Sequence, residues 1–79
     1  MRIEILYFGQ IAELAGSNKG TMNLPDGSDV ARLRHTLLEQ FPKMKGLPFK
    51  IAVNQTIEKE DYIIASNAEV AILPAYAGG

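Results

Sequence analysis

The sequence contains no cysteine and only one histidine, His35. Without cysteine the chain cannot form a disulfide framework, a thiolate metal site or a cysteine nucleophile. A single histidine cannot supply a Ser-His-Asp set, and no glycine-rich phosphate loop follows a predicted strand. Glu58, Glu60 and Asp61 form an acidic cluster without further ligands at metal spacing, so we predict a solvated turn there. The chain is not expected to be an enzyme by itself.

Neither sign of charge is in clear surplus, with eight basic and nine acidic residues and a net charge of -1. Binding to a phosphate backbone usually needs a basic surplus, so we expect no nucleic-acid partner. Lys43, Lys45 and Lys50 cluster in a stretch with proline and glycine, which is typical of a solvated loop. No apolar run reaches the length of a signal core or a membrane span, so we expect a cytoplasmic protein without a membrane partner.

The length of 79 residues, 47% of them hydrophobic, fits one domain with a small core. At this size there is little room for a deep internal active site in addition to the core. We therefore expect the chemistry at an edge or an end. We assign residues 1–74 to the domain and residues 75–79 to an extended tail.

Two segments predict central strands of a sheet. Residues 2–8 alternate at first and then become continuously apolar, and residues 69–73 are apolar up to Pro74, which cannot continue a hydrogen-bond ladder. Such apolar strands usually lie in the middle of a sheet, so we expect these two side by side and parallel. The other predicted elements are a short helix at 9–16, extended segments at 19–24, 50–53 and 62–65, and a loop at 42–49.

Residues 29–41 predict the main helix, which we expect to pack on the sheet in an α+β fold. Ser28 is the expected N-cap, and Pro42 stops the helix. Helical geometry places His35 roughly 140° from the apolar stripe, so it should face solvent. The stem of Arg34 should pack while its guanidinium reaches the edge of the core. The residues of the stripe are Val30, Leu33, Leu37, Leu38 and Phe41.

The tail after Pro74 has no charged side chain and ends in Gly78-Gly79. At average glycine usage of about 7%, a double-glycine end arises by chance in roughly 0.5% of chains. Five extended residues reach about 17 Å, and two glycines are thin enough for a narrow channel. A carboxylate is a poor electrophile, so we expect a partner to adenylate Gly79 with ATP before a sulfur nucleophile displaces AMP. A trimmed or flexible end is the structural alternative.

Three segments resemble a known family: LYFGQIAELAG at 6–16, AVNQT at 52–56, and EVAILP at 69–74 running into the double glycine. Together they resemble the small subunits of molybdopterin synthase, which are ubiquitin-like β-grasp sulfur carriers. The likeness runs nearly end to end. A double glycine alone is shared by the whole ubiquitin superfamily, but its combination with the other two segments is more specific.

The resemblance implies that Gly79 bears a thiocarboxylate, and that Gly78 and the preceding tail insert into the large catalytic subunit of a heterotetrameric synthase. There, two sulfurs would convert a cyclic pterin precursor into the dithiolene of the molybdenum cofactor. An E1-like adenylating enzyme would use the ATP, and this chain would bind no cofactor. Ile57 and Leu73 would belong to an apolar patch that both partners contact, with strand core as an equal alternative. The tail residues expected to bind partners are Pro74, Ala75, Tyr76 and Ala77.

The tail departs from the family at two positions. Ala75 stands where the family often has a second proline, and Tyr76 where it often has a small or β-branched residue. We therefore expect a less stiff tail and a partner channel that admits an aromatic ring.

Three other functions remain open. A sulfur carrier of the thiamin pathway also ends in two glycines on this fold, although the opening segment and AVNQT favour molybdopterin. A ubiquitin-like protein modifier would pass the activated Gly79 to a lysine of a target. A non-catalytic β-grasp interaction module would have an inert tail.

Overall fold

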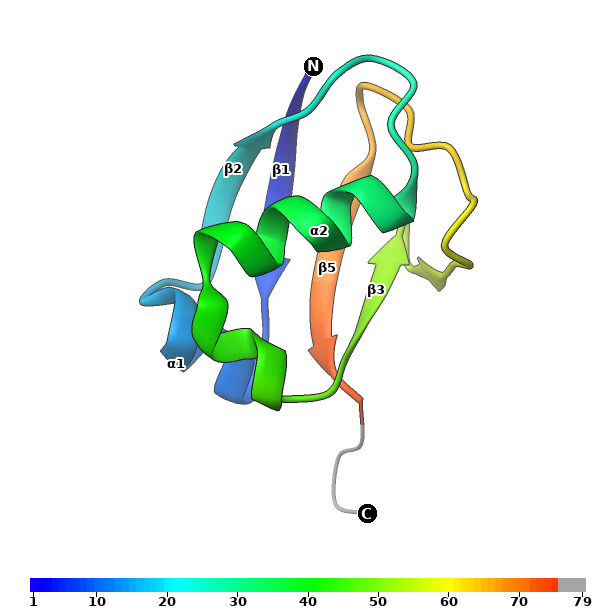
Figure 1. Ribbon diagram of the computed structural model, residues 1–79. Coiled ribbons are helices and arrows are strands. Elements are labelled where there is room, and N and C mark those ends of the chain that lie inside the picture. Colours follow the sequence, from blue (N-terminus) through cyan, green and yellow to red (C-terminus); the bar gives the residue numbers. More distant parts are fainter. Residues whose placement is uncertain (76–79) are drawn as a thin grey trace.

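The computed structural model describes residues 1–75, and its elements form a single five-stranded sheet with helices (Figure 1). The strand order is β2-β1-β5-β3-β4. No helix in this part of the chain is long and apolar enough to cross a membrane. The strands are β1 (Arg2–Tyr7), β2 (Lys19–Asn23), β3 (Phe49–Val53), β4 (Thr56–Ile57) and β5 (Glu69–Pro74). The helices are α1 (Gly9–Ala15), α2 (Val30–Gln40) and the 3-10 helix η1 (Pro42–Gly46).

The first and last strands lie side by side in the middle of the sheet. β1 and β5 pair in parallel, with Ile5 opposite Val70 and Tyr7 opposite Ile72. The other neighbours, β2 on β1, β3 on β5 and β4 on β3, are all antiparallel. The predicted parallel pair at the centre of a mixed sheet is therefore confirmed.

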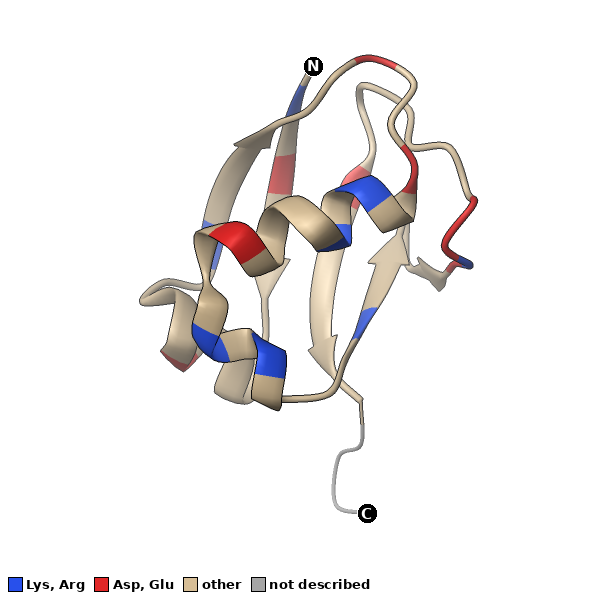
Figure 2. Cartoon of the chain, in the orientation of Figure 1, with Lys and Arg blue, Asp and Glu red and all other residues tan. Residues whose placement is uncertain are grey.

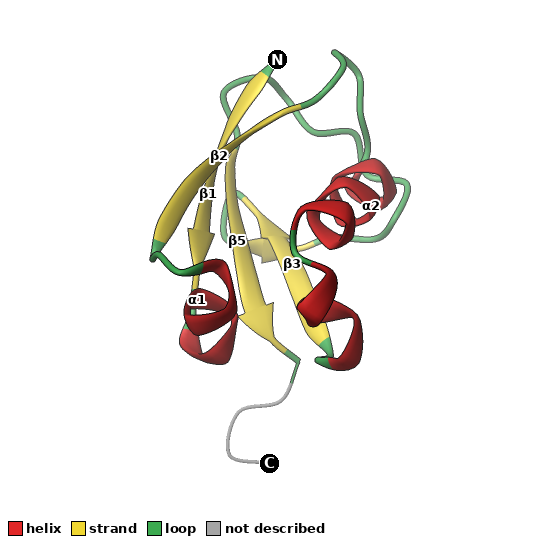
Figure 3. Ribbon diagram, turned by 60° about the vertical axis from the view of Figure 1, so that its left-hand side comes forward, coloured by secondary structure: helices red, strands yellow, loops and turns green. Residues whose placement is uncertain are grey.

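The main helix α2 crosses one face of this sheet (Figures 1 and 3). Its N-cap is Asp29, whose carboxylate accepts a hydrogen bond from the backbone N–H of Arg32 at 2.9 Å. The predicted N-cap, Ser28, is wrong by one residue. Its buried hydroxyl instead donates to the carbonyl of Pro25 at 2.6 Å and closes the preceding turn.

The centre of the apolar stripe of α2 packs on the sheet as predicted, whereas Leu38 at its margin is only partly buried. Val30, Leu33 and Leu37 are fully buried, whereas Phe41 is the C-cap and only partly buried. The Phe41 ring meets the Tyr7 ring edge-on, with centroids 6.0 Å apart. Burial raises the pKa of the Tyr7 phenol. The predicted exposure of His35 is confirmed, since 69% of its side chain is accessible.

The segment at 42–49, which we predicted as a loop, contains the 3-10 helix η1. Pro42 stands in its first turn, where a fixed φ and a missing N–H are tolerated. Three residues per turn direct Met44 into the core, where it is fully buried, while Lys43 and Lys45 stay exposed. Met44 thus closes the core at the end of the sheet where β5 stops.

Candidate functional site

The face of the sheet turned away from α2, here called the open face, is defined by residues that alternate with the core residues. Ala52 stands opposite both Ile57 and Ala71, and Leu73 follows Ala71 on the same face. Ile57 is 55% exposed and Leu73 is half-buried. The register therefore places both predicted patch residues on the open face, outside the core formed beneath α2.

Phe8 is a further apolar residue of this region that sequence reasoning missed. It is 44% exposed, and its backbone N–H donates to the carbonyl of Ile72 at 3.2 Å. The continuous apolar run at 6–8 predicts a central strand, but it does not show that Phe8 stays exposed. The period-two alternation of the strand could have predicted this position, because Leu6 lies on the open face and Phe8, two residues later, continues that face beyond the end of β1. We call Leu6, Phe8, Ile57 and Leu73 the apolar patch.

A tight hairpin turn positions Ile57. Asn54 and Gln55 both have positive φ, at 50° and 70°, as a two-residue hairpin of the favoured twist requires. The side-chain oxygen of Asn54 accepts a hydrogen bond from the backbone N–H of Glu69 at 3.0 Å. The backbone N–H of Asn54 donates to the backbone carbonyl of Glu69 at 2.8 Å. The AVNQT segment thus ties the β3–β4 hairpin to the start of β5.

The tail leaves the domain next to the apolar patch. β5 includes Pro74, one residue beyond the predicted strand at 69–73, and Pro74 stands opposite Phe49 of β3. The backbone N–H of Ala75 then donates to the carbonyl of Pro48 at 3.1 Å. Where the family often has a second proline, this chain therefore holds residue 75 by a hydrogen bond. The other predicted tail residues, Tyr76, Ala77, Gly78 and Gly79, lie outside the described residues.

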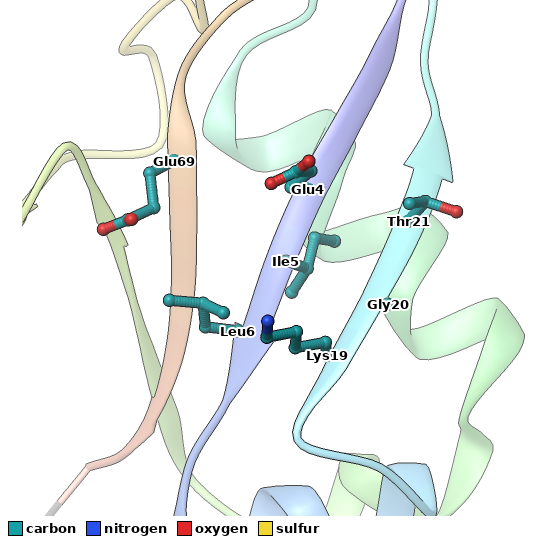
Figure 4. Close-up of a pocket in the computed structure, with 7 residues that line it drawn as sticks. All are labelled: Glu4, Ile5, Leu6, Lys19, Gly20, Thr21 and Glu69. Carbon is teal, nitrogen blue, oxygen red and sulfur yellow. The ribbon is translucent and has the colours of Figure 1, made fainter.

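A shallow depression of about 600 Å³ also lies on the sheet, toward β2 (Figure 4). Glu4 of β1 and Glu69 of β5 stand in register beside it, and Lys19 approaches from β2. Its lining contains no histidine. Its lining residues are Glu4, Ile5, Leu6, Lys19, Gly20, Thr21 and Glu69.

Charges are distributed unevenly along the molecule (Figure 2). The acidic cluster of Glu58, Glu60 and Asp61 lies in the segment that follows β4, and no three metal-ligating side chains gather anywhere in residues 1–75. Glu60 accepts from the Arg34 Nε at 2.8 Å, and the guanidinium lies 4.9 Å from the centre of the Phe49 ring. The prediction that Arg34 packs its stem and reaches the edge is therefore confirmed.

Comparisons with known proteins agree with this geometry. The chain is 30% identical to the molybdopterin synthase sulfur carrier subunit of Chlamydomonas reinhardtii, over 100% of both sequences. SAMP1 from Haloferax volcanii matches with a TM-score of 0.84 at 19% identity, over 100% of both chains. A chain from the complex of subunits 1 and 2 of the Helicobacter pylori molybdopterin-converting factor matches with a TM-score of 0.68 at 22% identity, also over 100% of both.

These structural matches confirm the predicted ubiquitin-like β-grasp fold. The sequence model of the ThiS family matches residues 5–79, which is nearly the whole chain. The match begins inside β1 and includes the apolar patch, the AVNQT hairpin and the double glycine. The chain therefore belongs to the ThiS family.

Proposed function

We propose that this chain is the sulfur carrier subunit of a molybdopterin synthase, with the Gly79 carboxylate as the group that carries sulfur. The observation that supports it most directly is the position of Pro74 and Ala75, which follow Leu73 of the exposed apolar patch at the end of β5. The relative from Chlamydomonas reinhardtii, which matches over its whole length, bears that function in its name. A carrier needs a surface for its partners and a reactive end, and it needs no catalytic pocket of its own.

The chemistry takes place in partner proteins. An E1-like adenylating enzyme joins the Gly79 carboxylate to AMP from ATP and releases pyrophosphate. A sulfur nucleophile at the oxidation level of sulfide then displaces AMP, so the chain ends in a thiocarboxylate. In the large catalytic subunit this sulfur passes to the pterin precursor, and water restores the carboxylate. Because each chain carries one sulfur, a dithiolene requires two loaded chains or two rounds of loading.

The apolar patch is the proposed docking surface for both partners. Exposed Phe8 and Ile57 offer apolar area that a partner can bury, while Leu73 and Pro74 connect this area to the tail. The residues from Ala75 to Gly78 would then occupy the channel that leads to the reacting atoms. Tyr76 requires this channel to admit an aromatic ring.

Mass spectrometry of the full chain, made together with its adenylating enzyme, ATP and a sulfur donor, tests this function. Replacement of one oxygen of Gly79 by sulfur is expected. Isopeptide adducts on lysines would instead indicate a protein modifier, and an unchanged terminus would indicate an inert module. The likeness to SAMP1 does not decide between carrier and modifier, because at 19% identity it shows the fold alone.

A separate experiment tests which pathway receives the sulfur. A loaded chain is incubated with the large subunit of molybdopterin synthase and the pterin precursor, or with a thiazole-forming enzyme. Dithiolene formation with the first and no thiazole with the second is the expected result. The reverse would assign the chain to the thiamin pathway.

A further inference from the structure

We propose that Gly9 is a positioning residue for the tail: its missing side chain lets the Pro74 ring lie against the start of α1, and this contact sets the direction in which the tail leaves the domain. The inference rests on the proposed function, since it takes the tail as the reactive segment. It means that sulfur transfer also depends on Gly9, a residue outside the tail.

The contact is close. Gly9 has a φ of 54°, and a Cβ built on it would lie 3.1 Å from Cγ and 3.8 Å from Cδ of Pro74. The first distance is tighter than ordinary carbon contacts, so an alanine at this position would have to displace the proline ring. Gly9 therefore combines a backbone conformation that favours glycine with a close approach that a side chain would disturb.

A second contact holds the tail base from the neighbouring strand. Gly9 follows β1, and Pro48 precedes β3, and these two strands flank β5 on its two sides. The Pro48 carbonyl accepts the hydrogen bond from the Ala75 N–H at 3.1 Å. Residues 74 and 75 are thus held from both sides, just before the tail begins.

The same residues link the tail exit to the apolar patch. Phe8 directly precedes Gly9, and Leu73 directly precedes Pro74. Two residues of the apolar patch are therefore adjacent to the two residues that contact each other at the tail base. In a partner channel that holds the tail extended over about 17 Å, a rotation of the tail base by a few degrees moves the end of the tail by about 1 Å. A misplacement of about 1 Å can slow an enzymatic step by as much as about 100-fold.

The test compares Gly9→Ala with Gly16→Ala. Gly16 also has a positive φ, at 77°, but a Cβ built there meets nothing within 4 Å. Both substitutions thus carry a similar backbone penalty, and only the first disturbs Pro74. Full-length thiocarboxylated chains are mixed with the large subunit and precursor, and single-turnover transfer is measured at saturation together with Kd.

We expect Gly9→Ala to transfer sulfur at least about tenfold more slowly at saturation, with Kd within about threefold of the unsubstituted chain. Gly16→Ala should stay within about twofold in both. Hydrogen exchange gives a readout that needs no partner. The Ala75 amide should exchange faster in Gly9→Ala than in Gly16→Ala, because the displaced ring disturbs the hydrogen bond to Pro48.

Equal transfer rates and equal Ala75 exchange in the two variants would overturn the inference. If Gly9→Ala does not fold, Pro74→Ala removes the ring without straining residue 9, and unchanged transfer and exchange in that variant would overturn it equally. Failure of the unsubstituted loaded chain to transfer sulfur would refute the proposed function instead. The exchange comparison would still decide whether Gly9 orients the tail base.

Discussion

The two faces of the sheet are built from the same strands but differ in what covers them. On the face beneath α2, Ile5, Ile51 and Val70 are fully buried. On the open face and at its margin, Ile57 and Phe8 keep about half of their surface exposed. Successive residues of one strand point to opposite faces, so that one residue packs in the core and the next contributes to the docking surface. Substitutions on one face should change stability, and those on the other should change partner binding.

Deletion of Gly79 should give the largest separation of function from folding. The reacting carboxylate would no longer lie at its place in the partner, so sulfur transfer should be abolished. The deletion leaves the core beneath α2 intact, so thermal unfolding should barely change. Dithiolene formation with the large subunit, adenylating enzyme and ATP measures sulfur transfer, and calorimetry measures thermal unfolding. Full activity of a chain ending at Gly78 would contradict the assigned role of the tail.

Leu37→Ala should have the largest effect on folding. Leu37 is 0% exposed beneath α2, so the truncation should leave a cavity and lower the free energy of unfolding by about 2 to 5 kcal/mol. Leu38→Ala is the matched control on the same helix, where the side chain is only half-buried, and it should cost clearly less. Urea unfolding measures both. Equal losses would contradict the placement of Leu37 at the buried centre of the stripe and of Leu38 at its margin.

The same substitution on the two faces tests the comparison most directly. Ile57→Thr keeps a β-branched side chain suited to a strand but removes apolar surface from the patch. It should weaken binding to the large subunit by about tenfold, and change the free energy of unfolding by less than about 0.5 kcal/mol. Ile51→Thr should instead cost roughly 1 to 3 kcal/mol of stability, because it buries a hydroxyl in the core. Calorimetric titration and urea unfolding separate the two effects.

His35→Ala should have the smallest effect. His35 faces solvent, and its ring nitrogen lies 3.6 Å from a carboxylate oxygen of Glu39, which is equally exposed. An exposed pair of this kind contributes little, so the free energy of unfolding should change by less than roughly 0.5 kcal/mol. Sulfur transfer should also be unchanged. A loss comparable to that of Leu37→Ala, two residues away on α2, would contradict the orientation of the helix.

Local pattern was sufficient to predict most elements but not their ends. Apolar alternation and helical spacing located β1, β5 and α2, since both depend only on neighbours in sequence. The N-cap was misplaced because Ser28 and Asp29 are both good caps, and only the preceding turn, which uses the Ser28 hydroxyl, decides between them. The segment at 42–49 was predicted as a loop because it contains two prolines and a glycine, and this composition does not show that Met44 is buried in the core.

The sequence by itself determined most of the elements, the separation of each strand into two sets of alternating residues, and the uncharged tail with its double glycine. Alternation shows which residues share a face, but not which face a helix covers. Only the tertiary structure decided that Ile57 and Phe8 stay exposed, and that Gly9 and Pro48 flank the tail base. These contacts join segments far apart in the chain. They exist only because β5 lies between β1 and β3 in the sheet, and local sequence patterns do not predict such long-range pairing.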